Sequence, residues 1–142
     1  MRRLSIDTEK QCVGCRQCEL ECSILHEGSF SPWLARVKVE MKEDTVLSYP
    51  IICHHCPNAP CATACPVGAI IKSKTTGAYY VDNRSCIGCL QCIEACPYGA
   101  MFFNNVKGIA IKCDLCGGNP ACVNVCPAKV IVEEVHNDAQ IK

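Results

Sequence analysis

The sequence lacks the features that several common classes of protein require. Its apolar runs are too short to span a bilayer, and no basic run exceeds the pair Arg2-Arg3. It has no glycine-rich nucleotide fingerprint, no P-loop, and no serine, histidine and aspartate arranged as in a hydrolase. The first ten residues contain no apolar segment of the signal-peptide kind. These absences argue against a membrane-spanning protein, a nucleic-acid-binding protein and a self-contained enzyme.

Large side chains are also scarce, with three Phe, one Trp and four Tyr among 142 residues. A chain of this length buries only a moderate core. Cysteine, in contrast, is abundant, with 16 residues, far above ordinary usage. We therefore expect metal held through thiolates to fill and cross-link the interior, and folding to depend on that metal.

The most regular cysteine motif runs from Cys86 to Pro97, CIGCLQCIEACP. Its spacing, C-x2-C-x2-C-x3-C-P, is that of a bacterial four-iron, four-sulfur site. The pattern recurs with small changes in three other stretches: Cys12-Cys15-Cys18-Cys22, Cys53-Cys56-Cys61-Cys65-Pro66 and Cys113-Cys116-Cys122-Cys126-Pro127. The first stretch has Ser23 in place of the proline, and the second and fourth have extra residues between their second and third cysteines. The four motifs use every cysteine, which predicts four [4Fe–4S] clusters.

Zinc and disulfides are the alternatives for such a cysteine count. Zinc sites usually draw two C-x2-C knuckles from separate places, whereas here three cysteines recur in one tight loop. Disulfides require an oxidising compartment, and cysteine-rich cytoplasmic chains more often bind metal. We therefore expect iron–sulfur clusters and a cytoplasmic location, with export alongside a signal-bearing partner as the alternative. The apo chain is formally neutral, and four oxidised clusters with their thiolates would add about −8, which again argues against nucleic acid.

Residue periodicity predicts short elements between the motifs. Strands are expected over residues 1–6, 36–41 and 129–135, and a short helix over 19–25 that ends near Gly28. Two hairpins are expected, one around Thr75-Thr76-Gly77 and one with its turn at 104–108. The run 117–120 is expected to be a turn rather than a helix.

Several residues outside the cysteines invite a functional interpretation. Phe30 and Trp33 are expected to form a lid over the first cluster, with a docking contact as the alternative. His54 and His55 lie inside the second motif, and we expect them to be loop histidines that hydrogen-bond nearby rather than ligands. The lone residues His26, His136 and Asp138 are expected to be solvated surface.

The segment from Cys53 to Pro97, with CPVGAI and the YVD that precedes CIGC, resembles a bacterial two-cluster ferredoxin. The whole chain resembles the four-cluster, ferredoxin-like electron-transfer subunits of multi-subunit oxidoreductases. The resemblance implies an α+β fold in which short strands, hairpins and helices of two interleaved ferredoxin-like modules wrap four clusters. It implies one compact domain over 1–142, with an inner module at about 46–103 and an outer module formed by 1–45 and 104–142.

In such subunits the fourth cysteine of each motif serves a neighbouring cluster. The resemblance therefore implies four ligand sets: Cys12, Cys15, Cys18 and Cys126; Cys53, Cys56, Cys61 and Cys96; Cys86, Cys89, Cys92 and Cys65; and Cys113, Cys116, Cys122 and Cys22.

The opening CVGCRQCELECSILHEGSFSPWLARVKV is similar to the small iron–sulfur subunits of tungsten-containing aldehyde oxidoreductases and of the tungsten benzoyl-CoA reductase. This similarity implies a non-catalytic subunit that relays electrons between a tungsten-pterin catalytic subunit and a flavin subunit or ferredoxin. A row of clusters that reaches the surface at both ends would also let copies of the chain stack and share electrons. A relay for a hydrogenase, a formate dehydrogenase or a carbon monoxide dehydrogenase is the alternative, followed by a free polyferredoxin. A structural zinc protein is the alternative from a different class.

Overall fold

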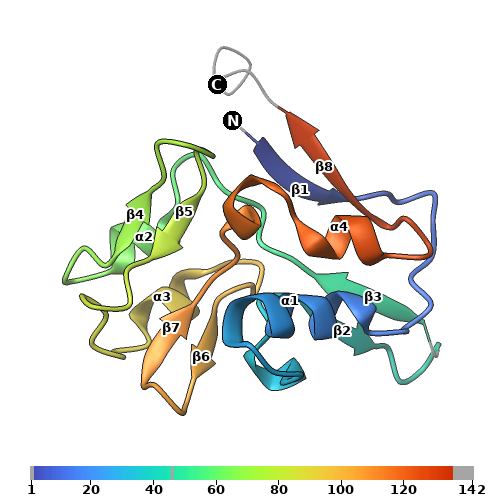
Figure 1. The fold of residues 1–142 in the computed structure, drawn as a ribbon, viewed down its shortest axis with the longest axis horizontal. Coiled ribbons are helices and arrows are strands. Elements are labelled where there is room, and N and C mark those ends of the chain that lie inside the picture. Colours follow the sequence, from blue (N-terminus) through green and yellow to red (C-terminus); the bar gives the residue numbers. More distant parts are fainter. Residues whose placement is uncertain (1, 46, 136–142) are drawn as a thin grey trace.

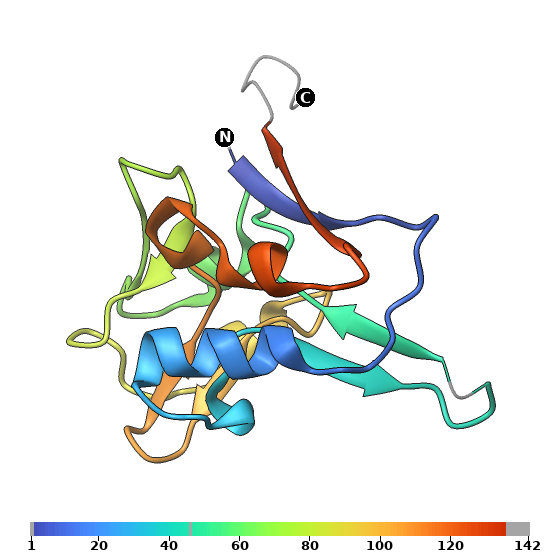
Figure 2. The same cartoon turned by 45° about the vertical axis from the view of Figure 1, so that its right-hand side comes forward.

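A computed structural model describes residues 2–45 and 47–135. Strand β1 (Arg2–Ile6) pairs antiparallel with β8 (Ile131–Val135), so that Ile6 lies opposite Ile131. Figures 1 and 2 show these two strands side by side, although they come from opposite ends of the sequence. Periodicity predicted both strands, but it contained no information on their pairing.

The other strands form three local hairpins. Strand β2 (Lys38–Met41) pairs with β3 (Ser48–Ile51), β4 (Ile70–Lys72) with β5 (Tyr79–Val81), and β6 (Phe102–Asn104) with β7 (Ile109–Ile111). Both predicted hairpins are confirmed. The Asn104 side chain closes the second turn, because its Oδ1 accepts hydrogen bonds from the backbone N–H groups of Val106 and Lys107.

Each motif places its third cysteine on a helix. The helices are α1 (Gln17–Glu27), α2 (Pro60–Ala64), α3 (Gln91–Ala95) and α4 (Ala121–Val125). Proline follows the fourth cysteine in the last three motifs, and a residue before proline avoids the helical region. Those helices therefore stop after five residues. Ser23 replaces that proline in the first motif, so α1 continues to Gly28, where a positive φ ends it as expected.

Two short 3₁₀ segments complete the chain, η1 (Pro32–Leu34) and η2 (Leu115–Gly118). The second segment is interrupted by positive φ angles at Cys116 and Gly117. The run 117–120 is therefore a turn that leads into α4, as the sequence indicated.

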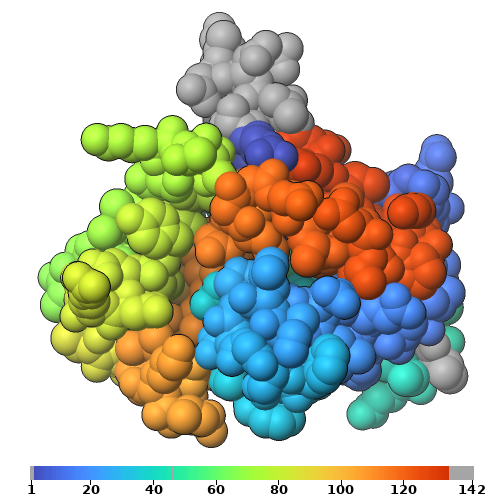
Figure 3. Space-filling model, in the orientation of Figure 1, coloured from blue at the N-terminus to red at the C-terminus, as the bar shows by residue number. Residues whose placement is uncertain are grey.

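The ends of the sequence pack together on one side of the molecule, and its middle forms the other side. Helix α1 packs on α4, and α2 packs on α3. Figure 3 shows the N-terminal and C-terminal segments in contact, with the middle of the chain at the left. One set of buried apolar residues packs Leu4, Val39 and Leu115 against cysteines of α1 and α4. A second set packs Ile70 and Met101 against cysteines of α2 and α3. The result is the mixed α+β fold that was expected.

Within residues 2–45 and 47–135, no helix is long and apolar enough to cross a membrane. The longest helix, α1, has 11 residues.

Candidate metal centres

The structure gathers the cysteines into groups that combine two motifs. Three cavities are each lined by four cysteines, three from one motif and the fourth cysteine of another. These are group I (Cys12, Cys15, Cys18 and Cys126), group II (Cys53, Cys56, Cys61 and Cys96) and group III (Cys65, Cys86, Cys89 and Cys92). The spaces that they enclose, mouths included, are close in size, at about 340, 380 and 330 Å³ respectively.

The remaining cysteines, Cys22, Cys113, Cys116 and Cys122, form group IV. Burial, together with charge repulsion from the nearby Cys116 and Cys22, raises the pKa of Cys122 to about 12. Burial also raises the pKa of Cys113, and Cys122 is again among the neighbouring charges. The four thiols therefore lie together between α1, η2 and α4.

Backbone N–H groups point at the sulfur atoms. The N–H of Ala69 lies 3.2 Å from Cys65 Sγ, that of Ala100 lies 3.4 Å from Cys96 Sγ, and that of Arg36 lies 3.2 Å from Cys22 Sγ. The pKa of Cys65 is lowered: burial raises it, but N–H donors of the following loop outweigh that effect. Such donors stabilise negative charge on sulfur, as a metal-bound thiolate requires.

The donor set fits a cationic metal core and not an empty interior. All sixteen cysteines are free thiols in the structure. Burial raises the pKa of Cys18 to about 12 and that of Cys92 to about 11, so these sulfurs become thiolates at neutral pH only beside positive charge. Four sulfurs are also the number of ligands that a cubane cluster requires.

The two histidines of the second motif differ from expectation. The His54 ring is exposed and stacks on the ring of Tyr98, with centroids 3.7 Å apart. His55 is buried and lines the group II cavity, and its backbone N–H points at Cys53 Sγ, 3.4 Å away. Neither of its ring nitrogens has a hydrogen-bond partner within the described part of the chain. The expectation that its side chain hydrogen-bonds nearby was therefore wrong. The imidazole of His55 instead lines the cavity that a group II cluster would fill, and its ring N–H is free to donate there.

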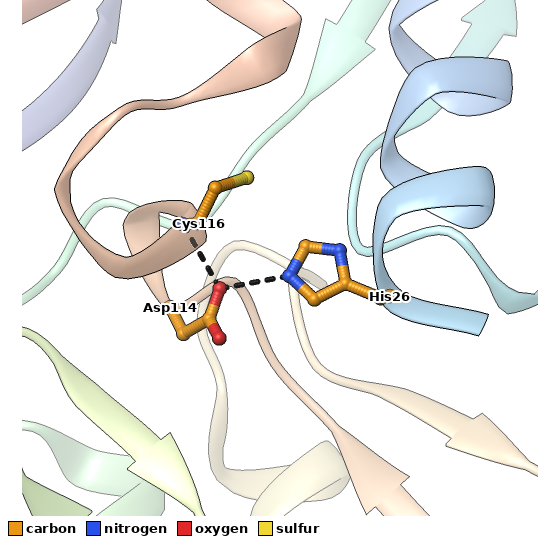
Figure 4. Close-up of side chains that lie close together, drawn as sticks. All are labelled: His26, Asp114 and Cys116. Atoms are coloured by element: carbon orange, nitrogen blue, oxygen red, sulfur yellow. Dashed lines mark hydrogen bonds and ion pairs between the residues drawn. The ribbon is translucent and has the colours of Figure 1, made fainter. Parts of the chain in front are cut away.

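His26 was expected at the surface, and that expectation was wrong. Its side chain is only 11% exposed, and its Nε2 lies 2.9 Å from Asp114 Oδ1. Figure 4 shows the imidazole of α1 directed at Asp114, which also accepts the backbone N–H of Cys116. Burial lowers the pKa of His26, but hydrogen bonds to Asp114 and Cys22 outweigh burial and raise it to about 9. The spacing of four between Cys22 and His26 could have signalled this, because such residues share a helix face.

His136 and Asp138, which were also expected at the surface, lie outside the described residues. His26, Asp114 and Cys116 have ligand atoms close enough together for a metal ion. The side chains of His26 and Asp114 are already paired with one another, and Cys116 belongs to group IV.

Phe30 and Trp33 do not cover the first site. They are 65% and 64% exposed, and neither lines the group I cavity. The loop that carries them is held instead by Ser23, whose Oγ accepts the N–H of Ser31. The lid expectation was therefore wrong, because this loop packs beside α1 rather than over the cysteines.

Sequence reasoning also missed Lys112, which precedes Cys113. This lysine is buried, at 4% exposure, and its Nζ lies 3.2 Å from Cys53 Sγ. A lysine placed between the apolar run 109–111 and Cys113 was the available signal.

Comparisons with known proteins indicate iron–sulfur clusters and an electron-transfer role. A family model described as a 4Fe-4S dicluster domain matches residues 45–135. The chain is 41% identical to the aliphatic sulfonate oxidoreductase polyferredoxin-like subunit of Pyrococcus furiosus over 119 residues, which cover 84% of this chain and 68% of that protein. It is 35% identical to the thiosulfate reductase electron transfer subunit PhsB of Salmonella typhi, covering 87% of this chain and 70% of that one.

A solved structure shares the fold along nearly the whole chain. It is a chain of the active site complex BamBC of benzoyl coenzyme A reductase in complex with benzoyl-CoA, with a TM-score of 0.53 and 26% identity. The match covers 99% of this chain and 85% of that chain. The protein therefore belongs to the 4Fe-4S dicluster domain family, and it is a non-catalytic iron–sulfur electron-transfer subunit.

Proposed function

We propose that groups I to IV each hold one [4Fe–4S] cluster and that the chain relays single electrons through all four. The four sets of convergent sulfurs support this count. The cavities of groups I to III support this pairing, because each is lined by three cysteines of one motif and the fourth cysteine of another. For group IV, the nearness of Cys22 to Cys116 and Cys122 supports it. The proposed modules are interleaved in the same sense, because groups I and IV combine the two ends of the sequence while groups II and III use only its middle.

The groups follow one another in the order I, IV, II, III. Helix α1 carries Cys18 of group I and Cys22 of group IV, one helical turn apart. Groups IV and II meet at Lys112, whose Nζ lies 3.2 Å from Cys53 Sγ and 3.1 Å from the carbonyl oxygen of Cys113. Groups II and III share α2, which holds Cys61 and ends at Cys65. Neighbouring clusters would therefore lie close enough for electrons to move within the protein.

Exposure of the cysteines is the observation that carries the proposal. Among the sixteen, all of which the structure describes, only Cys15 and Cys89 are exposed. Cys15 belongs to group I and Cys89 to group III, the two ends of the row. A relay needs its terminal clusters at the surface and its inner clusters shielded, because exchange with partners takes place at the ends.

We propose a tungsten-pterin oxidoreductase subunit as the partner at one end and a flavin subunit or ferredoxin at the other, all in the cytoplasm. The similarity of residues 12–39 to small subunits of tungsten enzymes supports the first partner. The fold shared with a chain of the benzoyl coenzyme A reductase complex along 99% of this chain also supports it.

Anaerobic purification of the native complex through a tag on this chain tests the assignment. Iron, tungsten, molybdenum and nickel are then measured together in the purified complex. We expect a large subunit that contains tungsten. Nickel in the partner would contradict the tungsten assignment and favour a hydrogenase or carbon monoxide dehydrogenase, and recovery of the chain alone at full yield would contradict a complex.

A further inference from the structure

Lys112 occupies the junction between the outer and the inner cysteine groups. It follows β7, in which Ile109, Ala110 and Ile111 are all buried, and it is itself 4% exposed. Its Nζ lies 3.2 Å from Cys53 Sγ of group II and 3.1 Å from the carbonyl oxygen of Cys113 of group IV. The ammonium group therefore lies between the second and third members of the proposed row.

This ammonium has no carboxylate partner among residues 2–45 and 47–135. Within the described residues, no Asp or Glu oxygen forms an ion pair with it, although eight such pairs occur elsewhere. Burying a charge without a counter-charge is costly, so a buried lysine is almost always paired. The sulfur that it contacts, Cys53 Sγ, would be anionic as a cluster ligand. A cluster in group II, net negative with its thiolates, supplies the missing counter-charge.

The cavities of groups II and III differ in the charged and polar side chains that line them. Groups II and III lie on matching five-residue helices and enclose similar space. The group II cavity is lined by Lys112 and by the unpartnered ring of His55. The group III cavity is lined by cysteines, glycine and apolar side chains, with no charged or hydrogen-bonding side chain. Positive charge and hydrogen bonds to sulfur raise the reduction potential of a cluster.

We infer that Lys112 is a positioning residue that raises the reduction potential of the group II cluster above that of its neighbour in group III. This inference rests on the proposed function, because it assumes that both groups hold clusters. Uptake of one electron from the redox partner makes the group II site more negative by one charge, and the adjacent ammonium stabilises that charge with no proton transferred. The electron therefore rests on the group II cluster, which adjoins group IV, rather than on the group III cluster, which lies at the exposed end near Cys89.

The test is Lys112→Met, which removes the charge and retains most of the side-chain length. The matched control is Lys74→Met, the same change on the exposed turn between β4 and β5. Each full-length protein is purified anaerobically, its iron is counted, and its clusters are titrated with dithionite while electron paramagnetic resonance is recorded. In Lys112→Met we expect one cluster to become harder to reduce by at least tenfold in its equilibrium constant, about 59 mV for one electron. The affected signal should be the one that Cys96→Ser also alters.

Lys112→Arg retains the charge and should restore most of the potential, which a purely structural role would not require. An unchanged set of four potentials in Lys112→Met, with full iron, would overturn the inference and leave the relay intact. A wild-type protein that never binds four clusters would instead overturn the proposed function. If Lys112→Met does not load with iron, Lys112→Gln replaces it. Iron loss in both neutral variants but not in Lys112→Arg would overturn a role in the potential and assign Lys112 to cluster retention.

Discussion

Gly88, in the loop between the first two cysteines of group III, gives the sharpest test of how the fold positions a site. Its φ is +73°, and a Cβ atom at this position would lie 2.5 Å from the carbonyl oxygen of Gly108. That oxygen belongs to the turn between β6 and β7 and cannot rotate away as a side chain does. Gly88→Ala therefore combines backbone strain with a clash against backbone.

Two other glycines separate these effects. Gly99 has φ +65° and open space around its Cβ position, so Gly99→Ala measures strain alone, about 1–2 kcal/mol. At Gly14, φ +71°, the added Cβ meets the Oγ of Ser48 at 2.7 Å, and that hydroxyl can rotate away. Gly88→Ala should lose a further 1–3 kcal/mol or so, the usual cost of overpacking.

The assay is the denaturant concentration that removes half of the visible cluster absorption, measured anaerobically on all three variants and the wild type. We expect the order wild type, Gly99→Ala, Gly14→Ala, Gly88→Ala from most to least stable, with the largest step before Gly88→Ala. Equal losses for Gly88→Ala and Gly99→Ala would refute the argument, because the contact with Gly108 would then carry no energy.

Three further predictions concern the cysteine groups and their surroundings. Cys96→Ser should impair the cluster held by Cys53, as seen in the electron paramagnetic resonance spectrum, and damage confined to the Cys86 cluster would contradict the grouping. Because the pKa of His26 is raised from 6.5 to about 9, its stabilisation should be complete below pH 6.5 and lost as pH rises through about 9. Asp114→Asn should flatten this loss between pH 7 and 10, and an unchanged slope would contradict the pairing. Iron removal by a chelator should abolish the circular dichroism of the fold, whereas a retained spectrum would show that the chain folds without metal.

The sequence predicted the local elements well because their causes are local. Alternation predicted β1 and β8, and turn residues predicted the β4–β5 and β6–β7 hairpins. Strand β3 was missed because Pro50 interrupts the pattern, and proline is tolerated there only since a two-stranded ribbon has free edges. The length of α1 was underestimated. The first motif has Ser23 where the other motifs have proline, and this difference could have predicted a longer helix.

Long-range placement could not be read from the same patterns. The burial of Lys112 and the pairing of His26 with Asp114, 88 residues apart, depend on how the ends of the chain meet. A lone histidine or lysine has no periodicity of its own, so its partner appears only with the tertiary structure. The cysteine spacing was informative because each motif contributes three cysteines to one group, and only the fourth cysteine of that group must be found elsewhere in the chain.

The central claim is that sixteen thiolates hold four cubane clusters. Iron and acid-labile sulfide, measured per chain in anaerobically purified protein, test it most directly. We predict about sixteen of each, because each cluster contains four irons and four sulfides. About four zinc ions per chain with no sulfide would contradict the account, since tetrahedral zinc would then occupy the cysteine groups.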